Sequence, residues 1–232
     1  MSLTKKYRIL LGAILAITST PMFPFFFSSP VKPKRVVTIM LDPAGDAQQT
    51  GRTIDDALER TLTLQYAEKL KQVVEEQNTN VRVVLSRDPG QTVQPLQNAH
   101  FANRLNVDLY LSIHFYAEHA TQPTIYLYNF SYNDDFITKK FDTAFCSYDQ
   151  AHLFNYGLTR THGTIIQQTL HAEEYKRQFT CAGMYKLPCK PLIGIKAPAI
   201  MFEAGLKDKD TWTTYVDPIA ESLKKIITMV QA

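Results

Sequence analysis

Three side chains that can bind a metal ion or move a proton follow apolar stretches of this chain. His114 comes after VDLYLSI, and Glu203 comes after APAIMF. Glu59 lies in the first turn of a helical pattern that follows a third apolar stretch, VVTIML. A histidine and carboxylates in one place suit zinc, which in catalytic sites keeps one position for water. A further carboxylate can take the proton of that water and pass it to a leaving amine.

These residue types predict Glu59 and His114 as metal ligands and Glu203 as the catalytic acid and base. Each residue also has an ordinary structural interpretation. A histidine after a strand is often only hydrogen bonded, and an acid in a first helical turn balances the helix dipole. The prediction of a site therefore depends on separate elements bringing the three side chains together.

The elements that must do so alternate between strands and helices, which predicts an α/β fold with a mainly parallel sheet. Strands are predicted at 36–41, 81–87, 107–115, 124–130 and 197–205. Helices are predicted at 55–77, 95–106, 161–178 and 210–230, the first of them capped by Thr53, Asp55 or Asp56. Residues 131–160 are aromatic, polar and irregular, as in an insertion or lid. Sites in such sheets form beyond the carboxyl ends of the strands, where His114 and Glu203 are expected.

Composition excludes several classes of function. The chain is 45% hydrophobic and 20% charged, which suits a globular protein with one core. The net charge is +3 with no dense block of lysine and arginine, so no nucleic acid partner is expected. No GxGxxG or GxxxxGKS loop occurs, which argues against a nucleotide enzyme. The three cysteines form no CxxC pair. A single disulfide between Cys181 and Cys189 is one alternative that the sequence allows.

The N-terminus has the pattern of an exported protein. Lys5, Lys6 and Arg8 precede roughly 20 mostly apolar residues without charge. Residues 1–30 are therefore predicted to be a signal peptide or an N-terminal membrane anchor, since their length is near the span of a bilayer core. The positive end should stay in the cytoplasm. The domain at 31–232 is then extracytoplasmic, for example periplasmic, and either free or anchored to the inner membrane.

Five blocks of this sequence resemble, in the same order, the zinc-dependent N-acetylmuramoyl-L-alanine amidases, a family of cell-wall hydrolases. TIMLDPAGD is similar to a family strand that ends in D-P-G-H-G, and ALERTL to a helix with E-x-x-x-(N/T)-L. VRVVLSRD resembles V-x-L-T-R, and ANRLNVDLYLSIHFYAE resembles A-N-x-x-x-A-D-L-F-(I/V)-S-I-H-A-N. APAIMFEAGLKD resembles x-P-A-V-L-V-E-x-G-F-(L/I)-S-N. The SIH and PAIMFEAG blocks are the specific ones.

The resemblance implies a three-layer phosphorylase/hydrolase-like α/β fold, with an amidase-like catalytic domain at 31–232. It also implies a zinc ion bound by Glu59 and His114, and a catalytic carboxylate at Glu203. The family's first histidine ligand does not carry over, because Gly45 stands in its place in DPAGD. A family arginine is likewise replaced by Asn98.

A third zinc ligand must then come from another residue. Asp46 is the first candidate and Asp42 the second, since both lie in the same loop as Gly45. The remaining candidates are His119, His152 and His162. Arg87, at the end of a predicted strand, either binds a carboxylate or is a solvated edge residue.

Two functions stay open. The resemblance implies a peptidoglycan hydrolase that cleaves the amide between N-acetylmuramic acid and L-alanine by zinc-activated water. Gly45 favours the alternative, a degenerate amidase-like domain that binds cell-wall peptides or regulates a partner without catalysis. Peptidoglycan is the expected ligand of the enzyme, and a protein regulator is an open possibility.

Overall fold

The computed structural model describes residues 35–94, 96–131 and 146–232. Contacts divide the chain into Met1–Pro33 and Lys34–Ala232, and every element described below belongs to the second unit. The predicted signal or anchor at 1–30 lies outside the described residues, as do 132–145 of the predicted insertion. Within the described ranges, no helix is both long and apolar enough to cross a bilayer.

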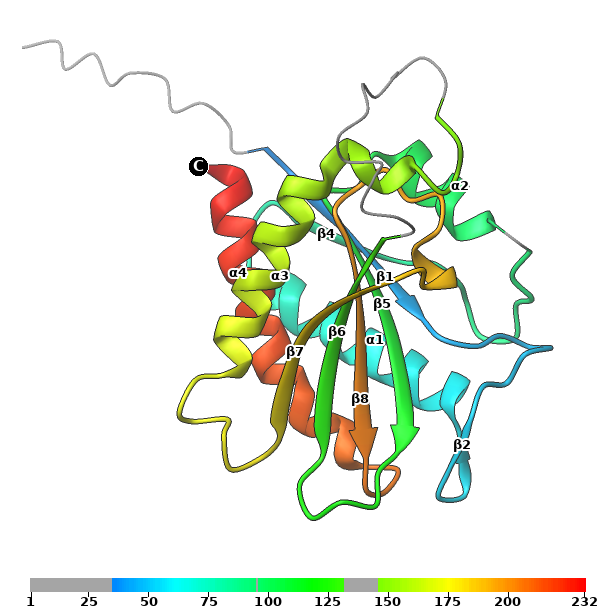
Figure 1. Cartoon of the computed structure of the whole chain (residues 1–232), viewed down its shortest axis with the longest axis vertical. Helices are drawn as coiled ribbons and strands as arrows, with labels where there is room; N and C mark the ends of the chain where they lie inside the picture. The colour runs from blue at the N-terminus through cyan, green and yellow to red at the C-terminus, as the bar shows by residue number, and fades with distance from the viewer. Residues whose placement is uncertain (1–34, 95, 132–145) are drawn as a thin grey trace, which may run out of the picture. The chain divides into compact units, whose positions relative to one another are not determined.

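Six strands form the central sheet in the order β4-β1-β5-β8-β6-β7 (Figure 1). Their bounds are β1 Val37–Pro43, β4 Val81–Leu85, β5 Leu109–Ala117, β6 Thr124–Phe130, β7 Thr180–Leu187 and β8 Ala199–Leu206. Strands β4, β1, β5 and β8 are mutually parallel, while β6 pairs antiparallel with β8 and parallel with β7. The predicted mainly parallel sheet is confirmed. The sequence analysis missed β7, a half-exposed edge strand that lacks a clear apolar pattern.

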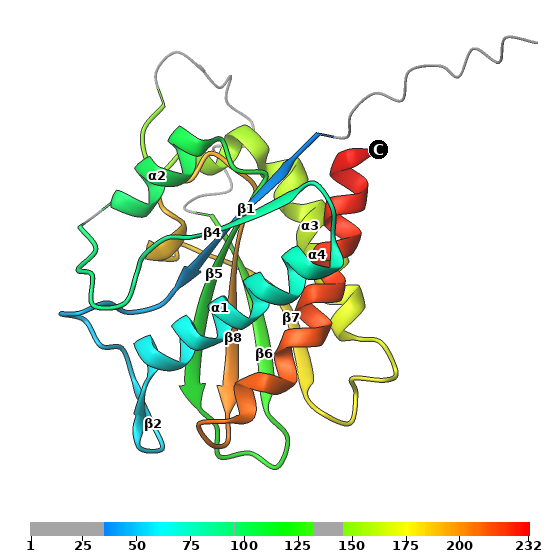
Figure 2. The same ribbon diagram turned by 180° about the vertical axis from the view of Figure 1, so that it is seen from behind.

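Helices lie on both faces of the sheet, as a three-layer fold requires. The bounds are α1 Glu59–Gln77, α2 Gln97–Leu105, α3 Tyr156–Leu170 and α4 Val216–Gln231. Figures 1 and 2 show α1, α3 and α4 along one face, where they share a core with β5 residues such as Leu111 and Phe115. On the opposite face, Ala99 and Ala102 of α2 pack with Tyr110 in a second core. Because strand side chains alternate between faces, strands such as β1, β5 and β8 contribute to both cores.

The helix predicted at 55–77 begins four residues later, at Glu59. Residues before it form a hairpin of β2 (Thr53–Ile54) and β3 (Ala57–Leu58), with Asp55 in a left-handed turn at φ 55°. Leu58 precedes the helix, and no side chain forms a capping hydrogen bond at this end. The prediction that Thr53, Asp55 or Asp56 caps the helix is therefore wrong. Burial of Ile54, which is 1% exposed, stabilises the hairpin relative to an additional turn of helix at the start of α1. Glu59 is therefore the first helical residue.

The second half of the chain also departs from the predicted bounds. The helix expected at 161–178 begins at Tyr156 and ends at Leu170, and a short 3₁₀ helix, Ala151–Asn155, precedes it. Ala151 and Thr159 are buried, so this part of 131–160 belongs to the packed domain. The three cysteines are free thiols, so no bridge joins Cys181 to Cys189.

The packing of α1 on the sheet generates a test of the fold. Leu70 of α1 is fully buried, so Leu70→Ala should lower the free energy of unfolding by about 2–5 kcal/mol. The exposed Gln72 on the same helix provides the control, since Gln72→Ala should change it by no more than about 0.5 kcal/mol. Urea denaturation followed by circular dichroism measures both. Equal losses would contradict this arrangement of α1.

Candidate functional site

His114 and Glu203 are direct neighbours in the sheet. They pair in the parallel register of β5 and β8, although each lies three residues before its strand ends, at Ala117 and Leu206, rather than at the end itself. Ile113 and Phe115 flank His114 in sequence and face the core under α1. The alternation of strand side chains therefore places His114 on the opposite face. The expected meeting of these two residues is found, on a face of the sheet near its carboxyl edge.

Glu59 joins them from the start of α1. Its Oε1 lies 3.4 Å from Nδ1 of His114 and accepts the backbone N–H of Phe115 at 3.0 Å. Its Oε2 accepts the backbone N–H of Arg52 at 3.0 Å. Burial by itself raises the pKa of Glu59, but the hydrogen bonds from His114, Arg52 and Phe115 outweigh it and hold the pKa below its usual value. The carboxylate is therefore ionised at neutral pH.

Asp42 orients the imidazole of His114 from the other side. Four side chains donate hydrogen bonds to the Asp42 carboxylate: Ser86 (2.6 Å), Asn98 (2.7 Å), Tyr110 (2.6 Å) and Ser112 (3.2 Å). The Ser112 oxygen also lies 3.2 Å from Nε2 of His114. Ser112 thus contacts both Asp42 and Nε2 of His114, while Nδ1 of His114 is the nitrogen that faces Glu59. Asp42 is thus engaged in positioning, and Asn98 is one of its donors.

The spacing of Glu59 and His114 matches two ligands of one zinc ion. Zinc bonds of about 2.0–2.1 Å in a tetrahedron place neighbouring ligand atoms about 3.3–3.4 Å apart. The observed separation between Oε1 of Glu59 and Nδ1 of His114 is 3.4 Å. The hydrogen bond at Nε2 of His114 is also the outer contact that commonly fixes a ligand histidine. The distance between Glu59 and His114 is therefore compatible with two ligands of one zinc ion.

The loop of Gly45 supplies no third ligand. Gly45 has φ +75°, and a β-carbon on it would lie 2.8 Å from Cβ of Arg60 and 2.9 Å from the carbonyl oxygen of Gln49. A histidine at this position has no room in the present loop conformation. The neighbouring Asp46 is drawn into the loop as well, as its Oδ1 accepts the N–H groups of Gln48 (2.8 Å) and Gln49 (2.6 Å).

The other oxygen of Asp46 accepts the backbone N–H of Val93 at 2.9 Å. The backbone hydrogen bonds from Gln49 and Val93 hold the pKa of Asp46 below its usual value. Both carboxylate oxygens therefore hold the loop together. As with Asp42, both oxygens of Asp46 already accept hydrogen bonds from the protein.

The other candidate histidines lie elsewhere. His119 is exposed in the loop after β5. The ring of His152 packs against Phe130, with centroids 4.9 Å apart. His162 of α3 is 1% exposed, and burial lowers its pKa to about 4. Among the described residues, no group of three or more His, Cys, Asp or Glu side chains is arranged to hold a metal ion.

A residue that sequence reasoning missed, Arg52, lies between the two carboxylates. Its NH1 nitrogen is 2.8 Å from Oε1 of Glu203 and 3.9 Å from Oε1 of Glu59. The same nitrogen donates to the carbonyl oxygen of Phe115 at 2.9 Å. The other oxygen of Glu203, Oε2, accepts the hydroxyl of Tyr128 at 3.0 Å. One feature of the sequence could have pointed to Arg52. Two acids were predicted in a site without a full set of metal ligands, so another positive charge was to be expected there.

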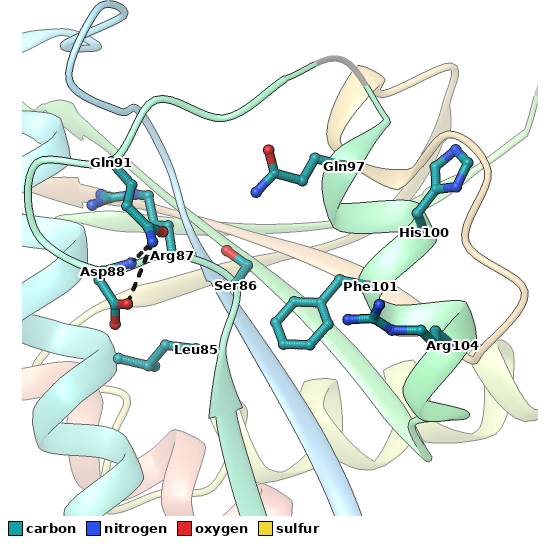
Figure 3. A pocket seen from close by; sticks show the side chains of 9 residues that line it. All are labelled: Leu85, Ser86, Arg87, Asp88, Gln91, Gln97, His100, Phe101 and Arg104. Atoms are coloured by element: carbon teal, nitrogen blue, oxygen red, sulfur yellow. Dashed lines mark hydrogen bonds between the residues drawn. The ribbon is translucent and has the colours of Figure 1, made fainter.

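A hollow of about 350 Å³ lies beside His114, which lines it together with Asp42, Gly45, Asp46 and Asn98 among others. A larger hollow of about 660 Å³ lies beside β4 and α2 (Figure 3), and its lining includes neither His114 nor Glu203. Its polar groups already have partners: His100 is bonded to Tyr148, and Arg104 lies over the ring of Phe101.

Arg87, also in the lining of this larger hollow, neither binds a carboxylate nor is solvated, contrary to both expectations. It is 5% exposed and donates to the carbonyl oxygens of Pro43 (3.1 Å), Ala44 (3.1 Å) and Arg60 (2.8 Å). Arg87 therefore fixes the loop that carries Gly45.

A family profile described as N-acetylmuramoyl-L-alanine amidase (Amidase_3) matches residues 39–222, which include Glu59, His114 and Glu203. The chain belongs to this family. Over 93 residues it is 37% identical to the N-acetylmuramoyl-L-alanine amidase CwlM of Bacillus licheniformis, which covers 40% of this chain and 37% of that protein. The chain thus aligns with little more than a third of the length of this curated relative.

Solved structures share the fold at low sequence identity. The amidase Ami1 of Mycobacterium abscessus matches with a TM-score of 0.62 and 14% identity, over 83% of this chain and 99% of that one. The CwlD amidase of Clostridioides difficile, solved in complex with the GerS lipoprotein, matches with a TM-score of 0.58 and 14% identity, over 83% and 99%. These similarities confirm the expected α/β amidase fold.

The crowded loop predicts a large cost for a β-carbon at Gly45. Gly45→Ala should lower the free energy of unfolding by about 2–5 kcal/mol, because backbone strain and atomic overlap add. Gly90 is the matched control, since it has φ +77° but no atom within 4 Å of the place that a β-carbon would take, so Gly90→Ala should cost about 1–2 kcal/mol. Urea denaturation measures both variants. Equal costs would show that the Gly45 loop relaxes and could admit a side chain.

Proposed function

We propose that this chain acts on peptidoglycan at the amide bond between N-acetylmuramic acid and L-alanine. Membership of the amidase family supports this substrate class. The observation that carries the proposal is the meeting of Glu59, His114 and Glu203, which come from three separate elements. Such a constellation is maintained by the fold of β5, β8 and α1 and serves hydrolysis rather than packing.

Zinc is general to this family, but the described residues do not fit a complete catalytic zinc site. Glu59 and His114 are suitably spaced, whereas a third protein ligand is missing from the Gly45 loop. Catalytic zinc sites use three protein ligands and a water. The guanidinium of Arg52 also lies within 4 Å of both Glu59 and Glu203. We therefore assign no step of the reaction to a metal ion.

Glu203 is the residue proposed to move the proton. It lies on the open face of the sheet, and its side chain is 15% exposed, so a water or a substrate nitrogen can reach it. Burial and the neighbouring Glu203 charge raise the pKa of Tyr128, which stays protonated and donates its hydroxyl to Oε2. This hydrogen bond orients the carboxylate. A positioned carboxylate can take a proton from water and return it to the leaving amine.

An aromatic surface continues from Glu203 across the sheet. Tyr116, Tyr126, Tyr128 and Tyr185 come from β5, β6 and β7, and their neighbouring rings lie 6.1–6.4 Å apart. Tyr185 is 45% exposed. Tyrosine rings offer flat apolar area with a polar hydroxyl, a combination that suits sugar rings. We propose that this tyrosine surface contacts the glycan strand next to the amide.

A second function is favoured by the contact between Arg52 and Glu203. An ion pair at 2.8 Å engages the carboxylate that should move the proton, and Gly45 offers no ligand. A domain of this kind would bind cell-wall fragments, or regulate a partner, without cutting. Loss of hydrolysis with retained binding to sacculi is the result that this alternative requires.

The proposed place of action follows from the substrate. Peptidoglycan is extracytoplasmic, so the domain at 31–232 should be exported, to the periplasm or its equivalent. Residues 1–30 then act as the signal peptide or as the anchor in the inner membrane. A protein regulator is compatible with this location.

The role of Glu203 is tested with Glu203→Gln. Purified sacculi treated with the wild-type domain should release peptides that begin with L-alanine, and the variant should reduce this release by about 10²–10⁴-fold, because a general acid and base is lost. Glu173→Gln, at a carboxylate whose side chain is 87% exposed, should leave release unchanged. Retained release by Glu203→Gln would refute the role. Binding of sacculi without release by the wild type would establish the second function.

The tyrosine surface is tested with Tyr185→Ser in co-sedimentation with sacculi. The variant should bind several-fold more weakly, because an exposed ring is worth about 1 kcal/mol or more when it stacks. Leu158→Ser removes a side chain of similar exposure from α3 and should leave binding unchanged. Equal binding by wild type and Tyr185→Ser would exclude this surface as the glycan contact.

A further inference from the structure

We propose that the guanidinium of Arg52 is the resident cation of this centre, so that the site is charge-balanced without a metal ion and Arg52 competes with any divalent metal for it. The inference concerns the same residues as the proposed function and rests on that placement of the site. It explains why a site with two well-spaced zinc ligands lacks the third.

One nitrogen of Arg52 makes the decisive contacts. NH1 lies 2.8 Å from Oε1 of Glu203, 2.9 Å from the carbonyl oxygen of Phe115 and 3.9 Å from Oε1 of Glu59. These oxygens come from β8, β5 and α1. A positive centre surrounded by oxygens from three elements is what a bound metal ion also requires. Oε1 of Glu59, which lies 3.4 Å from Nδ1 of His114, therefore interacts with both the imidazole and the guanidinium.

The backbone before Arg52 is shaped for this contact. Gly51 has φ +73°, and a β-carbon on it would lie 2.7 Å from Oε2 and 2.8 Å from Cβ of Glu59. Only glycine lets the chain approach the carboxylate this closely. Arg52 and Glu59 then bond reciprocally: the N–H of Arg52 donates to Oε2 at 3.0 Å, and the N–H of Glu59 donates to the carbonyl oxygen of Arg52 at 2.8 Å. The arginine is thus held at the site by its backbone.

Two carboxylates meet one cation at this place. The side chains of Glu59 and Glu203 are 4% and 15% exposed, and NH1 of Arg52 lies within 4 Å of an oxygen of each, so their negative charges concentrate around one nitrogen. A guanidinium stays charged at every relevant pH and balances them. A dication on Glu59 and His114 would bring its own charge close to NH1 of Arg52. The two positive charges would repel each other, so metal binding and the arginine contact compete. The Arg52 side chain is 50% exposed and can turn toward solvent when a metal ion binds.

An ordinary surface ion pair is the competing explanation, since most such pairs contribute little. It predicts that Arg52 has no influence on metal affinity. It also does not explain the glycine at position 51 or the hydrogen bond from NH1 of Arg52 to the carbonyl oxygen of Phe115. The two explanations therefore differ in a measurable quantity, the dissociation constant for zinc.

The test measures zinc binding to EDTA-treated domain by isothermal titration calorimetry. Arg52→Ala should bind zinc about tenfold or more tightly than the wild type, because a positive charge near the metal position is removed. Arg82→Ala, at an exposed arginine of β4, should equal the wild type. Glu59→Gln in the Arg52→Ala background should abolish the gain, which places the bound zinc at this centre.

Thermal unfolding gives a second readout on the wild type. Its midpoint should not change on treatment with EDTA, because Arg52 already balances the carboxylates. Zinc at one equivalent per purified chain, removed by EDTA with a fall in the midpoint, would overturn the proposal. So would equal zinc affinity in the wild type and Arg52→Ala.

Arg52→Gln covers the case in which Arg52→Ala does not fold. Glutamine keeps a hydrogen-bond donor for Glu203 but no charge, so it should also gain zinc affinity; affinity equal to wild type would refute the charge argument. If neither variant folds, zinc at one equivalent per wild-type chain that EDTA removes would still overturn the proposal. None of these readouts depends on hydrolysis. A domain that releases no peptide fails the proposed function, while its zinc affinities still decide the role of Arg52.

Discussion

The structure around the site depends on the carboxylate of Glu59. Its two oxygens accept backbone N–H groups from β5 and from the segment before α1, and one of them faces the imidazole of His114. These contacts connect the hairpin of β2 and β3, the first turn of α1 and the central strand β5. Because Glu59 is buried, removing its charge would leave these donors without their partner. Arg52, Phe115 and His114 are thereby placed around one carboxylate.

The sheet was predictable because its signal is local. Long apolar segments such as 107–115 and 197–205 identified β5 and β8, and the parallel connections of an α/β fold then brought His114 and Glu203 together. The edge strand β7 and the hairpin before α1 were not predictable in this way. β7 is half exposed, and the hairpin depends on burial of Ile54 against distant residues. A pattern of residue types along the chain does not contain such contacts.

The site was predictable as far as its residue types matched a known constellation. Glu59, His114 and Glu203 lie together as expected, but the roles of the substituted positions depended on three-dimensional contacts. Asp46 offered a plausible carboxylate, yet the nearest donors to its oxygens are backbone N–H groups of its own loop and of Val93. Arg52 carried no motif at all. A loop arginine becomes part of a site only through the path of its backbone, which here depends on Gly51.

Two glycines therefore shape the site in different ways. At Gly45 the loop closes against Arg60 and Gln49, which removes the space for a ligand side chain. At Gly51 the loop closes against Glu59, which brings a guanidinium to the same carboxylate. A metal ion at Glu59 and His114 would place a second positive charge close to NH1 of Arg52, which already lies 2.8 Å from Glu203. The closed Gly45 loop supplies no ligand for such an ion, and the Gly51 turn supplies a cation in its place. The two loops are therefore both consistent with the guanidinium that we propose for this centre.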